Sequence, residues 1–190
     1  MKTDRKGFIK STCMAGAALC GFSAIGFTGN SSQKKSGLLG NTPDDQALLQ
    51  RDYISKLISG IASGLPESEI RDILKGCAIV HYNNLKMDEL LSPFIGNLEG
   101  FLKFISDNWG WKIDYDKETG ILIGDENKSF CVCPMVNQEN NTISDAICYC
   151  SEGFSEKMFS VVTGKPVKAT VISSVFRGDK SCKYKIEFKI

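Results

Sequence analysis

The C-terminal segment constrains the fold of this chain more than any other part of the sequence. Residues 167–176 are rich in β-branched side chains, Gly178-Asp179 is a turn pair, and residues 182–190 alternate strictly between apolar and polar. An alternation with period two places all the apolar side chains on one face of a strand. Two such strands joined by a turn predict a β-hairpin with one buried face, and Cys182 belongs to that face.

The preceding residues predict helices followed by an antiparallel meander. Apolar residues recur at helical spacing over residues 42–64, from residue 66 onward and over residues 97–108. Cys77 shares the apolar face of the second helix and is expected to point inward. From residue 109 the period changes to two, with strands expected at residues 111–115, 121–123 and 129–133. A helix capped by Ser151 and ended by Gly164 then leads into the hairpin.

The predicted fold class is therefore α+β, with N-terminal helices packed on an antiparallel sheet and a C-terminal helix followed by a β-hairpin. The composition agrees with one folded domain: the chain has 190 residues, of which 42% are hydrophobic and 24% charged. Its formal net charge is +1, with Lys and Arg spread along the whole length, so the chain has no basic field for binding nucleic acid.

The N-terminus has the order of an export signal. Residues 2–10 are charged, residues 13–27 are mildly apolar, and a polar linker follows. Residues 4–10, Asp-Arg-Lys-Gly-Phe-Ile-Lys, resemble the twin-arginine signal of bacteria, but Lys6 replaces the second arginine, so general secretion stays open as the route. We expect an export signal at residues 1–26, a flexible linker at 27–41 and one domain at 42–190, mainly helical to residue 108 and a sheet with one helix from 109. Such a protein would be periplasmic or otherwise extracytoplasmic, and would meet the membrane only through an uncleaved leader.

The mature chain would hold six cysteines, and their spacing is compatible with more than one chemistry. Cys131 and Cys133, like Cys148 and Cys150, are two residues apart, so in an extended segment both sulfur atoms of a pair point to the same side. A disulfide within such a pair would close a small strained ring, which favours a shared third partner. Two pairs supply four thiolates for a tetrahedral zinc ion or, as the second choice, an iron–sulfur cluster. Disulfides between the pairs and unlinked buried thiols are the alternatives.

The segment from Cys148 to Ile190 resembles a known kind of domain. It contains Cys148-Tyr-Cys-Ser-Glu-Gly-Phe, then Thr163-Gly-Lys-Pro-Val, then Gly178-Asp-Lys-Ser-Cys182-Lys-Tyr. This ordered set is similar to the C-terminal part of the vinyl-reductase-type small-molecule-binding domain and of the related aminothiazoline-carboxylate hydrolase-like proteins. The resemblance implies helices packed on an antiparallel sheet, with a pocket between them for a small apolar ligand.

The resemblance also implies a structural zinc in phenol-sensing members, held by a cysteine before the helix, a Glu and a Cys on the penultimate strand, and the hairpin cysteine. Cys148 and Cys182 match the first and last of these positions, whereas Val171 and Ser174 occupy the middle two. The implied zinc site therefore does not transfer intact, and other cysteines must substitute. The candidate metal ligands are Cys131, Cys133, Cys148, Cys150 and Cys182.

The sequence favours an exported small-ligand-binding or sensor-like domain with a structural metal over an enzyme. Four thiolates close the coordination of zinc, whereas water activation needs an open position. His81, the only histidine, follows Cys77 by one helical turn and could form a nucleophile–base pair, but an inert histidine is the simpler interpretation. The alternatives are a metal-dependent hydrolase of the aminothiazoline-carboxylate hydrolase-like type and a disulfide-stapled interaction module. The ligand and the oligomeric state stay open.

Overall fold

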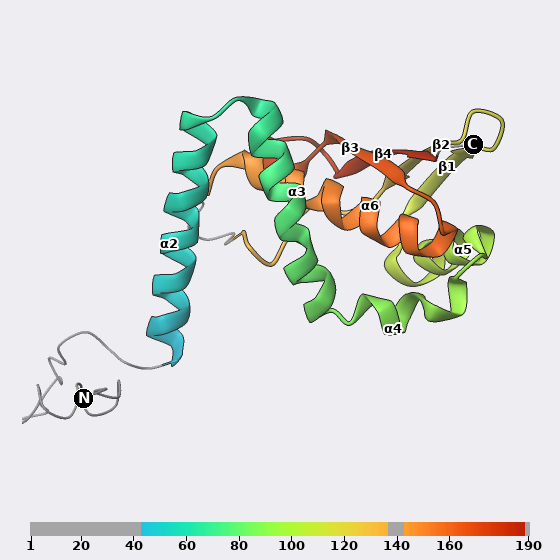
Figure 1. The fold of residues 1–190 in the computed structure, drawn as a ribbon, viewed down its shortest axis with the longest axis horizontal. Helices are drawn as coiled ribbons and strands as arrows, with labels where there is room; N and C mark the ends of the chain where they lie inside the picture. Colours follow the sequence, from blue (N-terminus) through green and yellow to red (C-terminus); the bar gives the residue numbers. More distant parts are fainter. Residues whose placement is uncertain (1–42, 137–142, 189–190) are drawn as a thin grey trace, which may run out of the picture. The chain divides into compact units, whose positions relative to one another are not determined.

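The computed structural model describes residues 43–136 and 143–188, so the expected export signal and linker lie outside the described residues. This part contains five α-helices and one four-stranded antiparallel sheet (Figure 1). The predicted α+β class is confirmed, as is the C-terminal helix followed by a hairpin. The helices are α2 (Pro43–Gly64), α3 (Glu67–Asn84), α4 (Met87–Leu91), α5 (Leu98–Trp109) and α6 (Tyr149–Thr163). The 3-10 helices are η1 (Ser92–Phe94), η2 (Asp145–Cys148) and η3 (Val175–Arg177), and the strands are β1 (Lys112–Asp116), β2 (Ile121–Asp125), β3 (Val167–Ser173) and β4 (Lys183–Phe188).

Local sequence signals set the ends of the predicted helices. α3 follows Pro66 and carries two acids in its first turn, where they complement the helix dipole. The Asn97 side chain caps α5 by accepting the N–H of Gly100 at 2.9 Å, and Gly110 ends that helix with φ 75°. The helices expected from residues 42, 66 and 97 therefore all form. Within the described ranges, no helix is both long and apolar enough to cross a membrane.

The start of α6 differs from the prediction. Ser151 was expected as the N-cap after an extended Cys148–Cys150 segment, but η2 precedes the helix and α6 begins at Tyr149. The Ser144 side chain accepts the N–H of Ala146 at 3.3 Å and so caps η2. A short apolar run without strict alternation does not distinguish a strand from a helical turn, which is why the sequence misled here.

The sheet has the strand order β1-β2-β4-β3, with every neighbouring pair antiparallel. The hairpin β1–β2 and the hairpin β3–β4 form as predicted, and Gly120 takes φ 66° in the first turn. The strand predicted at residues 129–133 does not form, and the edge of β2 opposite β1 pairs with β4 instead. Residues 126–136 form a loop without helix or strand.

The described residues form two hydrophobic clusters. The larger joins α3–α6 to the sheet and includes Phe101, Phe159, Leu122 and Ile186, all with no exposed surface. In Figure 1, α3 and α6 run side by side over the sheet. The smaller cluster links α2 to α3, to η2 and to the loop of residues 126–136, which carries Cys131 and Cys133 and is named the cysteine loop. Its buried members are Ile58, Ile70, Leu74, Ile143, Ala146 and Ile147. The cysteine-bearing segments therefore hold α2 against the rest of the domain.

Candidate functional site

The five candidate cysteines come from three places around the first turn of α6. Cys148 is the last residue of η2 and the N-cap of α6, and Cys150 lies one residue into that helix. Cys131 and Cys133 belong to the loop after β2, and Cys182 directly precedes β4. None of the six cysteines in the described part of the chain forms a disulfide.

Ser174 joins two of these cysteines. Its hydroxyl lies 3.1 Å from Sγ of Cys148 and accepts the N–H of Phe176 at 3.1 Å, and the residue is only 2% exposed. Burial raises the pKa of the Cys182 thiol, and a hydrogen bond from Ser174 lowers that pKa in part. Cys148 and Cys182, which match the first and last positions of the implied zinc site, therefore share one buried hydroxyl.

Cys131 connects the remaining thiols electrostatically. Burial raises the pKa of Cys148 and Cys182, and raises that of Cys133 to about 11; in each case a negative charge on Cys131 raises the pKa further. Because like charges oppose the ionisation of their neighbours, Cys131 lies within electrostatic reach of Cys133, Cys148 and Cys182. Within residues 43–136 and 143–188, however, no three His, Cys, Asp or Glu side chains are arranged around one point as metal ligands. The metal at these cysteines therefore stays a prediction.

Two expectations about individual cysteines were wrong. Cys148 and Cys150 do not share an extended segment, and residues two apart in a helix point about 200° apart. Burial raises the pKa of Cys150 to about 11, the charge of Cys77 raises it further, and a charge on Cys150 also raises the pKa of Cys133. Cys77 was expected to point inward, but it is exposed, because the buried line of α3 runs through Ile70, Leu74 and Ala78 instead.

Glu126 is a residue of this region that the sequence analysis missed. Its backbone N–H donates to the carbonyl of Cys182 at 3.0 Å, and its Oε1 accepts the hydroxyl of Tyr184 at 3.0 Å. Its Oε2 is buried and has no hydrogen-bond partner in the described part of the chain. Burial raises the pKa of this carboxyl. The sequence showed only a turn at residues 125–128, because the pairing of β2 with β4 that brings Glu126 to Cys182 has no local signal.

Behind the cysteines, one face of α6 covers the free edge of the sheet. Edge strands expose unpaired N–H groups, and β3 is such a strand. The N–H groups of alternate β3 residues donate to α6 side chains one turn apart: Val171 to Glu152 at 2.8 Å, Ala169 to Glu156 at 3.0 Å, and Val167 to Ser160 at 3.2 Å. We call these three side chains, Glu152, Glu156 and Ser160, the α6 ladder. They take the place of a neighbouring strand.

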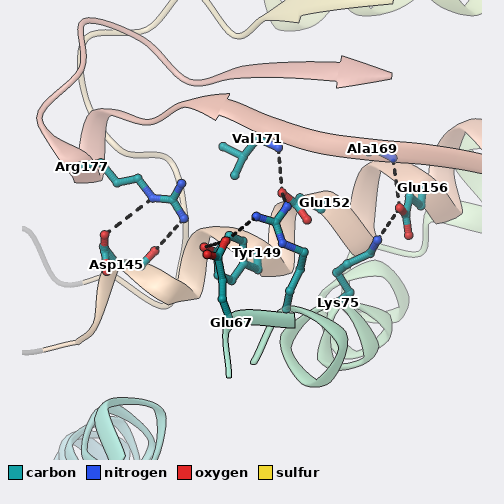
Figure 2. Close-up of polar contacts among 10 residues, drawn as sticks. Glu67, Lys75, Asp145, Tyr149, Glu152, Glu156, Ala169, Val171 and Arg177 are labelled. Carbon is teal, nitrogen blue, oxygen red and sulfur yellow. Dashed lines mark hydrogen bonds and ion pairs between the residues drawn. The ribbon is translucent and has the colours of Figure 1, made fainter. Parts of the chain in front are cut away.

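α3 neutralises the two carboxylates of the ladder. Arg71 Nη1 lies 2.8 Å from Oε1 of Glu152, and Lys75 Nζ lies 2.5 Å from Oε1 of Glu156. Figure 2 shows Lys75, Glu156 and Ala169 in one line, with Glu152 beneath Val171. Glu152 has no exposed surface, so its charge depends on these partners.

Close approach of the helices makes this arrangement possible. A Cβ atom at Gly153 would lie 2.2 Å from the carbonyl oxygen of Lys75, a distance that real atoms do not reach. Only glycine therefore lets α6 and α3 meet at this point.

Tyr149, between the two cysteines of its motif, is held by two arginines. The guanidinium groups of Arg71 and Arg177 lie 4.3 Å and 5.0 Å from its ring centre, within the range of cation–π attraction. Its hydroxyl donates to Glu67 at 2.8 Å, and Arg177 also lies near Asp145 of η2 (Figure 2). The start of α6 is thus fixed to α3 on one side and to η3 on the other.

The outer face of α2 carries an apolar groove. It is lined by residues of the second half of α2 and the residue after it: Tyr53, Lys56, Leu57, Gly60, Ile61, Gly64 and Leu65. Tyr53 is 70% exposed and Leu57 51%. The groove is wide open to solvent and has a volume of about 510 Å³.

The described residues define an α+β domain that carries cysteines at the start of its last helix, in the loop after β2 and directly before β4. The chain belongs to a family of unknown function, DUF6144, whose model matches residues 22–190. No curated protein matches the chain.

Two solved structures are similar to this chain. One is subunit 3 of a trafficking protein particle complex from Naegleria fowleri, covalently bound to palmitic acid, with 14% identity, a TM-score of 0.40, and coverage of 78% of this chain and 98% of that one. The other is the phenol-responsive sensory domain of the transcription activator PoxR with phenol, with 12% identity, a TM-score of 0.41, and coverage of 73% and 74%.

Proposed function

We propose that the chain is an exported, non-enzymatic binding or sensor-like domain whose cysteine cluster holds one structural zinc ion. The observation that carries the metal is the meeting of Cys148 and Cys182 at the hydroxyl of Ser174, with Cys131 in electrostatic reach of both. Thiolates are the ligands that structural zinc prefers. A bound zinc would replace thiol protons with metal–sulfur bonds and join the segments that carry them.

The fit of the residues to zinc rests on their donor chemistry and on one unpartnered atom. The region offers several thiols and the buried, unpaired Oε2 of Glu126. Burial raises the pKa of these thiols, so without a cation they stay protonated at neutral pH. A dication reverses this balance, since a coordinated thiol loses its proton.

The proposed role of the metal is to support the fold. The cysteine loop and η2 pack in the smaller hydrophobic cluster, which is the attachment of α2. Binding energy at a structural zinc site is folding energy, because the site does not exist in the unfolded chain.

Metal content and melting temperature measured on protein purified without chelator test the proposal. We expect about one zinc per chain, and we expect Cys148→Ser and Cys182→Ser to lower the zinc content and the melting temperature together. His81→Ala should keep the zinc content of the wild type, because His81 stacks on Phe154 at 5.0 Å. Six oxidised cysteines without metal would support the disulfide module instead, and a hydrolytic activity lost in His81→Ala would support the hydrolase.

A small apolar ligand is the second part of the proposal, and the groove on α2 supports it. The groove is apolar with one cation, which suits an apolar molecule with an anionic end. Isothermal titration calorimetry with a fatty acid tests this part. We expect Leu57→Glu to abolish saturable binding and Leu48→Glu, also exposed on α2, to leave it unchanged.

Export is the third part. It follows from the order of charged, apolar and polar segments in residues 1–41. N-terminal sequencing of protein from the native host should give a start between about residue 22 and residue 32. A cytosolic protein that begins at Met1 would contradict it.

A further inference from the structure

We infer that α2 forms an antiparallel pair with α2 of a second copy of this chain, and that this pair makes the protein a weak symmetric dimer. The inference goes beyond the proposed function, since it needs neither the metal nor an apolar ligand. It rests on the exposed side of α2, on two charges beside that side, and on the length of the helix.

An apolar stripe runs along the exposed side of α2. Apolar and small residues recur there every three or four positions, so they share one face of the helix. They are Leu49, Tyr53, Leu57, Gly60 and Gly64. Leu49 and Tyr53 are both 70% exposed, whereas Ser55 and Ile58, on the other side of the helix, are buried. A helix with apolar side chains on both sides is typical of one that packs between two partners.

Two charges beside the stripe make it complementary to itself. Asp52 and Lys56 lie one turn apart on the same flank of α2, and neither has an ion-pair partner in the described residues. A two-fold axis across an antiparallel helix pair brings each flank against the same flank of the copy. Asp52 of each chain therefore lies beside Lys56 of the other, and the dimer gains two equivalent ion pairs.

The same alignment places a large side chain opposite a small one. With the two-fold axis between residues 54 and 55, Leu49 lies opposite Gly60 of the second copy. A Cβ atom added to Gly60 would have no neighbour within 4 Å in the described part of the chain, so this glycine leaves a gap on the helix surface. The leucine can fill this gap, which lets the two helices approach closely.

A parallel pair would fit less well. It would bring the two charges against the opposite flank of the copy, where Gln50 and Ile61 are uncharged. It would also place the acidic first turns of the two helices side by side and align their dipoles. The distribution of charge on α2 therefore favours the antiparallel arrangement.

The length of α2 limits the strength of the dimer. Its 22 residues make a contact strip about 33 Å long and about 10 Å wide. Such a strip covers roughly 300 Å² on each copy, less than the roughly 800 Å² per partner of a standard stable interface. We therefore expect a dissociation constant on the order of 10 µM, so that the dimer and the monomer exchange.

Sedimentation equilibrium of the full-length protein, without added fatty acid, tests the inference. Asp52→Lys and Lys56→Asp each turn both ion pairs into pairs of like charge. Each variant should dimerise about 10-fold more weakly than the wild type, which corresponds to about 1.4 kcal/mol. An equal mixture of the two variants should associate as well as the wild type, because the two substituted chains carry opposite charges at the facing positions.

The apolar stripe is tested with a matched pair of leucines. Leu49→Glu should leave the protein monomeric, because it places a charge at the centre of the stripe's first turns. Leu48→Glu should dimerise like the wild type, since Leu48 is also exposed but points about 100° away around the helix. Leu49 does not line the groove on α2, so Leu49→Glu should keep the proposed binding of fatty acid, and the two proposals can fail separately.

Three results would overturn the inference. The first is a wild-type protein that stays monomeric at about 10 times the expected dissociation constant. The second is an association that Leu49→Glu and the single charge variants leave unchanged, which would place the contact elsewhere in the chain. The third is a mixture of the two charge variants that associates no better than each variant alone, because an antiparallel pair requires the facing charges to match.

Discussion

Glu152 shows how much of this fold depends on single polar residues. Its carboxylate has no exposed surface, and its Oε1 accepts both the N–H of Val171 and the guanidinium of Arg71. A buried charge destabilises the fold unless partners offset it, and Oε2 of Glu152 is buried without a hydrogen-bond partner in the described residues. The two contacts of Oε1 therefore carry the compensation, and they tie α6 to a strand and to another helix.

Glu152→Ala should therefore destabilise the protein strongly. It leaves the N–H of Val171 buried without an acceptor and Arg71 without its inner partner, which should cost roughly 2–4 kcal/mol. Urea unfolding measures this change. The control is Asp107→Ala, which removes the exposed pair with Lys103 at 2.7 Å and should change the stability by less than about 0.5 kcal/mol. Equal effects of the two substitutions would contradict the importance of burial.

His81 should make the stability depend on pH. Burial lowers the pKa of His81 below its usual value, so the unfolded chain binds a proton more readily than the folded one. The stability that neutral His81 contributes is fully present above the pKa that His81 has in the unfolded chain. It is lost as the pH falls through the lower pKa that His81 has in the folded protein.

His81→Phe should remove this dependence and keep the stacking on Phe154. The difference in unfolding free energy between wild type and variant should change between about pH 7 and pH 5, with the wild type losing more as the solution becomes acidic. Comparison at the same pH cancels the other titrating groups. A constant difference over this range would show that His81 does not carry the effect.

At the scale of residues, the sequence identified the cysteines but not the two buried carboxylates, Glu126 and Glu152. Cysteine is rare enough for its spacing to be noticed, and Cys148 and Cys182 do meet at Ser174. Glu126 and Glu152 look like any surface acid in the sequence. Their burial results from contacts between distant strands and helices, which no local pattern reveals.

Among the elements, the pair α3 and α6 depends on Gly153. Its lack of a side chain brings the backbone of α6 against Lys75, and this contact keeps the α6 ladder within reach of the cations of α3.

Gly153→Ala should cost roughly 1–3 kcal/mol, because the helices must separate to admit the methyl group. Gly76→Ala is the matched control: it lies in α3, and nothing lies within 4 Å of its added Cβ. This control should stabilise the protein by about 0.5–1 kcal/mol, since alanine is the better helix former. Thermal unfolding should show a lower melting temperature for Gly153→Ala and a higher one for Gly76→Ala. A higher melting temperature for Gly153→Ala would refute the close contact.

The elements that the sequence predicted well are the ones with a long period and clear ends. α2, α3 and α5 have helical spacing over 12 or more residues, α5 is also capped by Asn97, and β4 alternates throughout. α4 escaped prediction because five residues are too few for a period. The pairing of β2 with β4 could not be predicted from the sequence, because no turn connects these two strands. The sequence analysis therefore placed a strand at residues 129–133, next to β2 in the chain, where the structure has a loop.

In the described part of the chain, the large hydrophobic cluster stabilises one region and the small cluster stabilises another. The larger cluster holds the sheet, α5 and α6, whereas α2 meets the domain only through the smaller one and exposes Leu49, Tyr53 and Leu57 on its other side. Regions with few buried contacts open at lower free energy than the global unfolding.

Native-state hydrogen exchange should therefore show α2 opening before the rest. The amides around Ile58 should exchange with a lower free energy than those of β4, and removal of bound metal by a chelator should lower it further, because the cysteine loop belongs to the same cluster. Exchange of α2 and β4 at one common free energy would mean that the two regions unfold together.

The α6 ladder also limits the length of the strand it covers. Four residues of a helix rise about 6.0 Å, whereas two residues of a strand rise about 6.6 Å, so a helix and a strand stay commensurate only over a short stretch. The three rungs lengthen from 2.8 to 3.0 to 3.2 Å along the helix. An insertion of a single residue between Glu152 and Glu156 would rotate the later rungs by about 100°, away from the strand. This part of the chain should thus tolerate substitutions on its outer surface but no change in length.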